Sequence, residues 1–261
     1  LIGALALTSL ALTACGDDAA GPSTEATTAA TVAETTTAAT DAAPTTEAAA
    51  PVPNQVDVAL SDFAIGMPAE IPSGYTRLSA TNSGAVEHHL IFARLHEGVT
   101  FDQLLGTFAT DQAAAEAMID YAGGPNGVMP GETGSVEVNL EAGEYVAICV
   151  IPGSDGLPHA AHGMVAQVTV TDGGEPATIA GLEVEGTISL TDFDFTVSEG
   201  FDGQGRMLVT NNAPQAHEVA VTRMGEGGSL EEYMALLADP STATPEIIAR
   251  YTGASGVTPI T

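Results

Sequence analysis

The sequence predicts a mainly β protein, an antiparallel β-sandwich that carries one helical insertion and is partly repeated along the chain. Three observations support this fold class. From Gln55 onward, short apolar or alternating runs are separated by Gly, Pro, Asn and Asp, which is typical of strands and turns. One segment among them has helical spacing instead. Several motifs of the first half recur in the same order in the second half.

The expected strands of the first half are runs of apolar or alternating residues bounded by turn formers, at residues 56–60, 75–80, 89–95, 135–140, 145–150 and 164–170. A helical insertion is expected at residues 100–121. There Phe101, Leu104 and Leu105 have helical spacing, and a run of alanines follows Asp111. The β pattern therefore carries its helix on one connection between strands.

The chain begins with an apolar run at residues 1–15 that ends in Leu12-Thr13-Ala14-Cys15. This run is too short to span a bilayer, and it resembles a bacterial lipoprotein signal in which Cys15 is the acylated residue. It has neither an initiator Met nor a basic start, so we expect the first residues of the signal to be missing. The resemblance implies an extracytoplasmic protein, lipid-anchored to the bacterial cell membrane through Cys15.

Residues 16–54 consist almost entirely of Ala, Thr, Glu, Asp and Pro. A segment with no aromatic and almost no branched aliphatic side chains cannot bury enough apolar surface to offset the entropy of ordering. We therefore expect a disordered linker between the membrane anchor and the folded part.

Repeated motifs divide the folded part into two copies. The matching segments of the first and second copy are Leu60-Ser-Asp62-Phe63 and Leu190-Thr-Asp192-Phe193, Asn82 to His88 and Asn211 to His217, and Arg94 and Arg223. We expect one domain at residues 55–172 and a second copy at residues 183–261. The second copy is expected to be truncated, because the sequence stops before any counterpart of Cys149.

The charge of the chain bears on its partners. Its formal net charge is −29, from 34 acidic residues against five arginines and no lysine. Such a surface repels nucleic acid and anionic lipid, so we expect no nucleic-acid partner. It would attract a basic redox partner protein, but the acidity has a simpler interpretation, since it also keeps an exported protein soluble.

A set of ligands for one copper ion is the most specific chemical signal in the sequence. Cys149, His159 and Met164 lie in one short segment, and His88 lies upstream. A thiolate and two imidazoles with a weak axial thioether form blue-copper electron-transfer sites, because soft sulfur favours Cu(I) and imidazole accommodates Cu(II). A cysteine in an apolar strand is most often an inert core residue. The His and the Gly-Met pair downstream favour a ligand here.

With these residues the chain resembles the cupredoxins, which take one His from a mid-sequence strand and then Cys, His and Met, in that order, from the loop joining the last two strands. The segment 145–164 is most similar to the type 1 copper loop of two-domain copper nitrite reductases, and the segment 82–88 resembles the Asn-to-His spacing of plastocyanin-like domains. The resemblance implies a Greek-key sandwich with one type 1 copper. Its ligands would be His88, Cys149, His159 and Met164.

Neighbouring histidines leave alternatives for two of these ligands. His89 competes with His88, but alternate strand residues face opposite ways, and the second copy has Glu218 at the position of His89. His162 competes with His159, although only His159 has the cupredoxin spacing to the Met. The remaining candidates, interpreted as structural, solvent-facing or rim residues, are His96, His217 and Met129.

The expected function is one-electron transfer by a surface-anchored copper protein. Copper storage or delivery is an alternative, and so is a metal-free binding or adhesion module of the same fold. In copper nitrite reductases and multicopper oxidases a His beside the Cys ligand leads to a catalytic copper, whereas Ile148 and Val150 flank Cys149. Nitrite reductases place a further catalytic-copper His where this chain has Ala93. An enzyme is therefore not expected.

Overall fold

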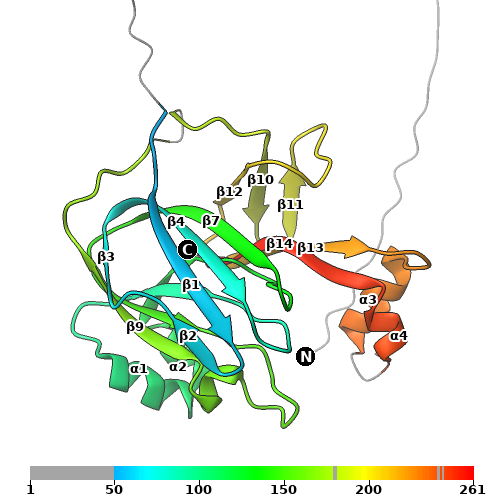
Figure 1. Ribbon diagram of the computed structural model, residues 1–261, viewed down its shortest axis with the longest axis horizontal. Coiled ribbons are helices and arrows are strands. Elements are labelled where there is room, and N and C mark those ends of the chain that lie inside the picture. The colour runs from blue at the N-terminus through cyan, green and yellow to red at the C-terminus, as the bar shows by residue number, and fades with distance from the viewer. Residues whose placement is uncertain (1–49, 179–180, 240–241, 243) are drawn as a thin grey trace, which may run out of the picture. The chain divides into compact units, whose positions relative to one another are not determined.

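The computed structural model describes residues 50–178, 181–239, 242 and 244–261. The expected signal segment 1–15, with Cys15, and residues 16–49 of the expected linker lie outside the described residues. In the described part strands dominate and helices are few, as the sequence predicts (Figure 1). No helix of this part is long and apolar enough to cross a membrane.

The elements of the first half, in chain order, are β1 (Asn54–Ser61), β2 (Ala64–Gly66), β3 (Glu70–Pro72), β4 (Gly74–Asn82), β5 (Ile91–Leu95), α1 (Phe101–Phe108), α2 (Gln112–Glu116), β6 (Ile119–Gly123), β7 (Thr133–Leu140), β8 (Gly143–Ile148), the short 3-10 helix η1 (His159–His162) and β9 (Val165–Thr171). The strands expected in this half are confirmed, with small shifts at their ends. β2, β3 and β6 were not expected.

Two sheets form a sandwich in this half. One has the strand order β2-β1-β4-β7, and the other contains β6-β5-β8-β9-β3 as part of a seven-stranded sheet. Side chains alternate along β1, so that Val56, Val58 and Leu60 are buried. They pack in one cluster with Phe92 of β5 and Val168 of β9. The predicted mainly β sandwich is confirmed.

The sheets are mixed, whereas the sequence predicted antiparallel pairing. Most neighbours are antiparallel, but β1 pairs with β4 in parallel and β3 pairs with β9 in parallel. The cause is the path between β1 and β4. After β2 the chain crosses to the other sheet to form β3, and it then returns to β4 running in the direction of β1.

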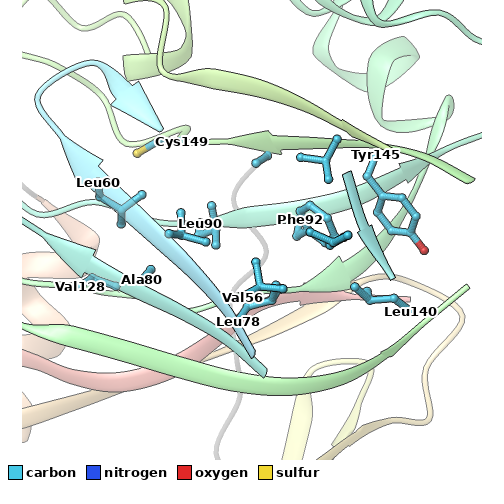
Figure 2. Packing of buried hydrophobic residues seen from close by; sticks show 14 of the residues in the cluster. Val56, Leu60, Leu78, Ala80, Leu90, Phe92, Val128, Leu140, Tyr145 and Cys149 are labelled. Carbon is cyan, nitrogen blue, oxygen red and sulfur yellow. The ribbon is translucent and has the colours of Figure 1, made fainter. Parts of the chain in front are cut away.

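The main hydrophobic cluster places the sulfur of Cys149 at one end of the core. Figure 2 shows Cys149 at one end of the labelled cluster and Leu140 and Tyr145 at the other. Phe92 stacks on Tyr145 near the far end, with ring centroids 4.8 Å apart. Cys149 is fully buried at this end of the cluster, so its thiol is shielded from water.

The helical insertion is shorter than the predicted span of residues 100–121. Thr100 caps α1 in a capping box with Gln103, and Asp111 starts a second helix, α2, by accepting from the Ala114 N–H. Tyr121 lies in β6, which pairs with β5. The predicted helix was wrong beyond Glu116, because an alternating segment there finds a strand partner.

The second half contains β10 (Gly186–Thr191), β11 (Asp194–Val197), β12 (Met207–Asn211), β13 (His217–Met224), α3 (Leu230–Ala238), α4 (Pro245–Ile248) and β14 (Tyr251–Ile260). Strands β10 to β12 form a separate three-stranded sheet. Its pairing matches that of β1, β2 and β4: Leu190 lies opposite Asn211, as Leu60 lies opposite Asn82. The same local architecture therefore occurs twice.

Strands β13 and β14 join the seven-stranded sheet of the first half. Ile260 of β14 pairs with Ala122 of β6, and the buried Thr258 hydroxyl donates to the Leu90 carbonyl at 3.2 Å. Gly124 permits this approach, because a Cβ there would lie 1.8 Å from the Leu90 carbonyl oxygen. By their contacts, residues Ala48–Thr261 form one compact unit. The domain boundaries 55–172 and 183–261 stay a prediction.

Candidate metal centre

Two parts of the chain that are distant in the sequence deliver the side chains of the candidate site: the residues just before β5 and the connection from β8 to β9. His88 lies just before β5, and its backbone exchanges two hydrogen bonds with Val128, of 3.1 and 3.0 Å. Cys149 follows β8, and its N–H donates to the Met164 carbonyl at 3.2 Å. His159 opens η1, and its N–H donates to the Ile151 carbonyl at 2.9 Å. Each candidate ligand is thus held by backbone hydrogen bonds.

The donor atoms of these residues converge. The Nδ1 atoms of His88 and His159 are 3.2 Å apart, and the Cys149 Sγ lies 3.5 Å from the His159 Nδ1 and 3.9 Å from the His88 Nδ1. His88 and Cys149 are fully buried, and His159 is 3% exposed. Within the described ranges these residues are the one group of His, Cys and acidic side chains close enough to share a metal ion.

Burial sets the protonation of the three groups. It lowers the pKa of His88 and of His159, so both imidazoles are neutral near pH 7 and each can offer a lone pair. Burial raises the pKa of Cys149, although backbone N–H groups of His89 and Ile151 partly oppose this. Without a metal the thiol is therefore protonated, and a cation that binds there must displace that proton.

Asn82 shapes the loop that carries His88. Its side-chain amide donates to the Val86 carbonyl at 2.8 Å and to the Val128 carbonyl at 2.9 Å, and its Oδ1 accepts from the Gly84 N–H at 2.8 Å. With these bonds the buried amide is well satisfied. The Asn-to-His spacing noted in the sequence therefore has a structural cause: the Asn fixes the loop, and the loop presents the His.

Met164 lies next to this group through its backbone. Its N–H donates to the His159 carbonyl at 3.1 Å, its carbonyl accepts from the Cys149 N–H, and its side chain is fully buried in the main hydrophobic cluster. Gly163 precedes it at φ 100, a left-handed conformation that ends η1 two residues before β9 begins. The sequence-predicted Met is therefore bonded to Cys149 through the backbone, and its side chain lies in the same buried cluster.

The other histidines lie outside the cluster. The Nε2 of His162 is 3.0 Å from Asp155, that of His96 is 3.0 Å from Asp120, and that of His217 is 3.2 Å from Asp192. His89 contributes its backbone, because its N–H donates to the Cys149 Sγ at 3.4 Å. Burial, followed by the charges of His159 and His88, lowers the pKa of His89 to about 4. Met129 is half-buried.

Two residues at the site were missed by the sequence reasoning. The ring of Phe63 packs edge-on against that of His159, with centroids 5.4 Å apart, and the Asp62 Oδ1 lies 3.4 Å from the His88 Nε2. Both belong to the repeated Leu60-Ser-Asp62-Phe63 motif. That motif had signalled the repeat but no role at the site.

Comparisons with known proteins give weak similarities. Neither a protein-family model nor a curated protein matches the chain. Among solved structures, reduced auracyanin from the photosynthetic bacterium Roseiflexus castenholzii is 17% identical, with a TM-score of 0.32, and the match covers 46% of this chain and 99% of that chain. Auracyanin A, a blue copper protein from Chloroflexus aurantiacus, is 19% identical, with a TM-score of 0.31, and the match covers 46% of this chain and 100% of that chain.

A copper-containing nitrite reductase from Thermus scotoductus is 11% identical, with a TM-score of 0.26, and the match covers 79% of this chain and 54% of that chain. All of these identities and TM-scores are too low to assign the chain to a family. Its function must be argued from the buried group of two imidazoles and a thiol.

Proposed function

We propose that His88, Cys149, His159 and Met164 hold one type 1 (blue) copper ion and that the protein transfers single electrons. The observation that carries this proposal is the convergence of two buried imidazole Nδ1 atoms and one buried thiol at one end of the core. An inert core cysteine would be expected among apolar neighbours. Here two neutral imidazoles point their nitrogens at it instead.

The donor set fits copper better than it fits the hard cations Mg²⁺ and Ca²⁺. Two imidazoles and a thiolate with a thioether nearby suit an ion that alternates between Cu(I) and Cu(II), whereas Mg²⁺ and Ca²⁺ prefer oxygen ligands. Bound copper would supply a one-electron couple. The chain's part is to fix the ligands from three backbone-anchored segments, so that little rearrangement accompanies a change of charge.

Electron transfer is favoured over catalysis by the residues beside Cys149. Ile148 and Val150 flank it, where the copper enzymes that the loop resembles have a His that leads to a catalytic copper. We infer that electrons pass through the ring edge of His159. The ring of Phe63 packs edge-on against that imidazole and is itself 44% exposed.

Copper reconstitution of the full chain tests this proposal. One equivalent of Cu(II) should give an intense visible thiolate-to-copper band, which Cys149→Ser should abolish and His162→Ala should largely spare. Protein that binds no copper would support the metal-free alternative. A coloured protein whose electron self-exchange, measured by NMR line broadening in mixed Cu(I) and Cu(II) samples, is immeasurably slow would instead support storage or delivery.

We also propose that the protein is anchored outside the cytoplasmic membrane through an acylated Cys15 and that its redox partner is basic. The lipobox-like end of residues 1–15 supports the first point, and the net charge of −29 supports the second. Wild-type protein should partition with membranes, whereas Cys15→Ala should not. Partner reduction rates should fall as ionic strength rises.

A further inference from the structure

The outer nitrogen of His88 faces a carboxylate. His88 is fully buried, and its Nε2 has no hydrogen-bond partner in the described part of the chain. The nearest acidic oxygen is the Asp62 Oδ1 at 3.4 Å, close enough for charge interaction but without hydrogen-bond geometry. A buried polar atom without a partner is costly.

The fold holds Asp62 in this position from two sides. Asp62 and Phe63 form the tight turn between β1 and β2, where Ser61 pairs with Ala64 and Phe63 takes a left-handed φ of 64°. The Ala85 N–H donates to the Asp62 Oδ1 at 2.9 Å. The turn and the loop before His88 therefore meet at this carboxylate.

Gly84 leaves the space for that meeting. A Cβ at Gly84 would lie 2.4 Å from the Asp62 Oδ1 and 2.9 Å from the His88 Nε2. Any other residue would push the carboxylate and the imidazole apart. The close approach of Asp62 to His88 therefore depends on a glycine at this position.

We propose that Asp62 is a positioning residue for the copper site: its carboxylate accepts the Nε2–H of His88 when the Nδ1 serves as ligand. This inference rests on the proposed copper function. A carboxylate on the outer nitrogen fixes the ring orientation and the tautomer, and it makes the imidazole a stronger donor. Its negative charge also favours Cu(II) over Cu(I).

The second half contains the same pair without the thiol. There the His217 Nε2 lies 3.2 Å from the Asp192 Oδ1, and both side chains are partly exposed. The Asp-to-His contact therefore forms from the turn and loop alone and does not require a neighbouring cysteine. In the first half the same turn and loop place Asp62 beside His88.

Asp62→Asn in the full chain tests the proposal. Asn keeps the size of the side chain and an oxygen for the Ala85 N–H, but it removes the charge. Competition with chelators should show an affinity for Cu(II) about tenfold lower, the size typical of outer-shell partners. The affinity for Cu(I) should fall less, so the reduction potential should rise. The copper hyperfine coupling in electron paramagnetic resonance should also change.

Two matched controls remove the same charge elsewhere. Asp155→Asn takes a carboxylate from the non-ligand His162, and Asp192→Asn breaks the equivalent pair in the second half. Both should leave affinities and potential within about twofold of wild type, because neither carboxylate contacts one of the proposed ligands. A shift with Asp155→Asn as large as that with Asp62→Asn would overturn the direct role of Asp62 and leave only general electrostatics.

Gly84→Ala provides a second, independent variant. It keeps the carboxylate but forces it away from the imidazole, so it should change the potential in the same direction as Asp62→Asn. A wild-type protein that takes up copper and turns blue, together with unchanged affinities and potential in both variants, would refute the role of Asp62 alone. Wild-type protein that stays colourless would refute the copper function itself, and with it this inference.

Discussion

The segments 60–88 and 190–217 share a local structure but differ in what surrounds their histidine. Phe63 and Phe193 both have a φ of 64°, and each turn places an aspartate near a histidine nitrogen, at 3.4 Å in the first half and 3.2 Å in the second. The side chain of His88 is fully buried, whereas that of His217 is 28% exposed. The turn, the loop and the histidine therefore have the same arrangement in both halves, and we call this shared arrangement the frame.

What the first half adds to this frame is the connection from β8 to β9. That connection supplies Cys149 and His159, and it buries the imidazole of His88 beside them. No described residue of the second half supplies a thiol, because the one described cysteine is Cys149. Comparison of the halves therefore separates the frame, which positions one imidazole, from the loop, which completes the candidate metal site.

Removing His88 or His217 should give the largest difference in copper affinity between the two halves. His88→Ala should lower Cu(II) affinity by more than about 100-fold and abolish or distort the visible band, since losing a ligand exceeds the roughly 10–100-fold cost of losing an outer-shell partner. His217→Ala should leave both unchanged. Chelator competition and absorption spectra measure this. A second tight copper that disappears with His217→Ala would break the proposed division of roles.

The matched leucines of the two turns should differ in stability. Leu60 is fully buried in the main hydrophobic cluster, so Leu60→Ala should cost about 2–5 kcal/mol. Leu190 is 5% exposed and belongs to neither hydrophobic cluster of the described residues, so Leu190→Ala should cost about 1 kcal/mol. Urea unfolding followed by circular dichroism gives both values. Equal losses would mean that the second half has a core of its own.

Copper affinity should depend on pH in a way that only a thiol site can produce. Burial raises the pKa of Cys149, so the thiol is protonated near pH 7 and must lose its proton to bind copper. Apparent affinity should therefore rise about tenfold per pH unit between about pH 7 and about pH 9, where the imidazoles are already neutral. Calorimetry in buffers of different ionisation enthalpy should show proton release. A flat profile would point to an imidazole-only site.

The smallest expected effect is the loss of stability when the ion pairs of Glu137, one of which joins the two halves, are broken. Glu137 of β7 accepts from Arg77 at 2.6 Å and lies 3.3 Å from Arg206 of the second half. Because both arginines are about 40% exposed, Glu137→Gln should cost about 1 kcal/mol or less. Double variants with Arg206→Gln should show how much of this loss couples the two halves. Strict additivity would mean that the bridge to Arg206 contributes nothing.

The pKa of Glu137 predicts how the stability lost in Glu137→Gln depends on pH. Burial opposes ionisation of Glu137, but hydrogen bonds from Tyr75 and Arg77 and the charges of Arg206 and Arg77 hold its pKa below the usual value. A depressed pKa stabilises the fold above the unfolded pKa of about 4.3, and that stability is lost as pH falls through the folded pKa. Wild type and Glu137→Gln should therefore differ at neutral pH and converge in acid.

The sequence predicted the strands well because their burial alternates. Val56, Val58 and Leu60 are apolar at every second position, and the structure buries all three. For residues 100–121 the sequence predicted one long helix, whereas the structure has two short helices and a strand. The alanines after Asp111 favour helix, but residues 119–123 pair with β5, and only the tertiary fold supplies that partner.

The convergence of His88, Cys149 and His159 could be predicted, because a compact motif contains the last two and the Asn-to-His spacing and strand alternation favour His88 over His89. The roles of Asp62 and Phe63 were not predictable. A phenylalanine with a left-handed φ is rare, so local propensity gives no reason to expect the turn that brings it to His159. The contact of Asp62 with His88 joins two loops and depends on Gly84, which no periodic pattern reveals.

The pairing of β14 with β6 has a bearing on aggregation. An open sheet edge, with its row of unpaired N–H and C=O groups, is a template on which another chain can add a strand. β14 lies on that edge of the sheet that carries the candidate ligands, while the outermost strand at the opposite end, β3, is short and ends in Pro72, which has no N–H to donate. The second half therefore covers β6 and makes β13 the outermost strand on that side. A chain shortened before β13 should still give the visible copper band but should aggregate more readily, because β6 is then an open sheet edge.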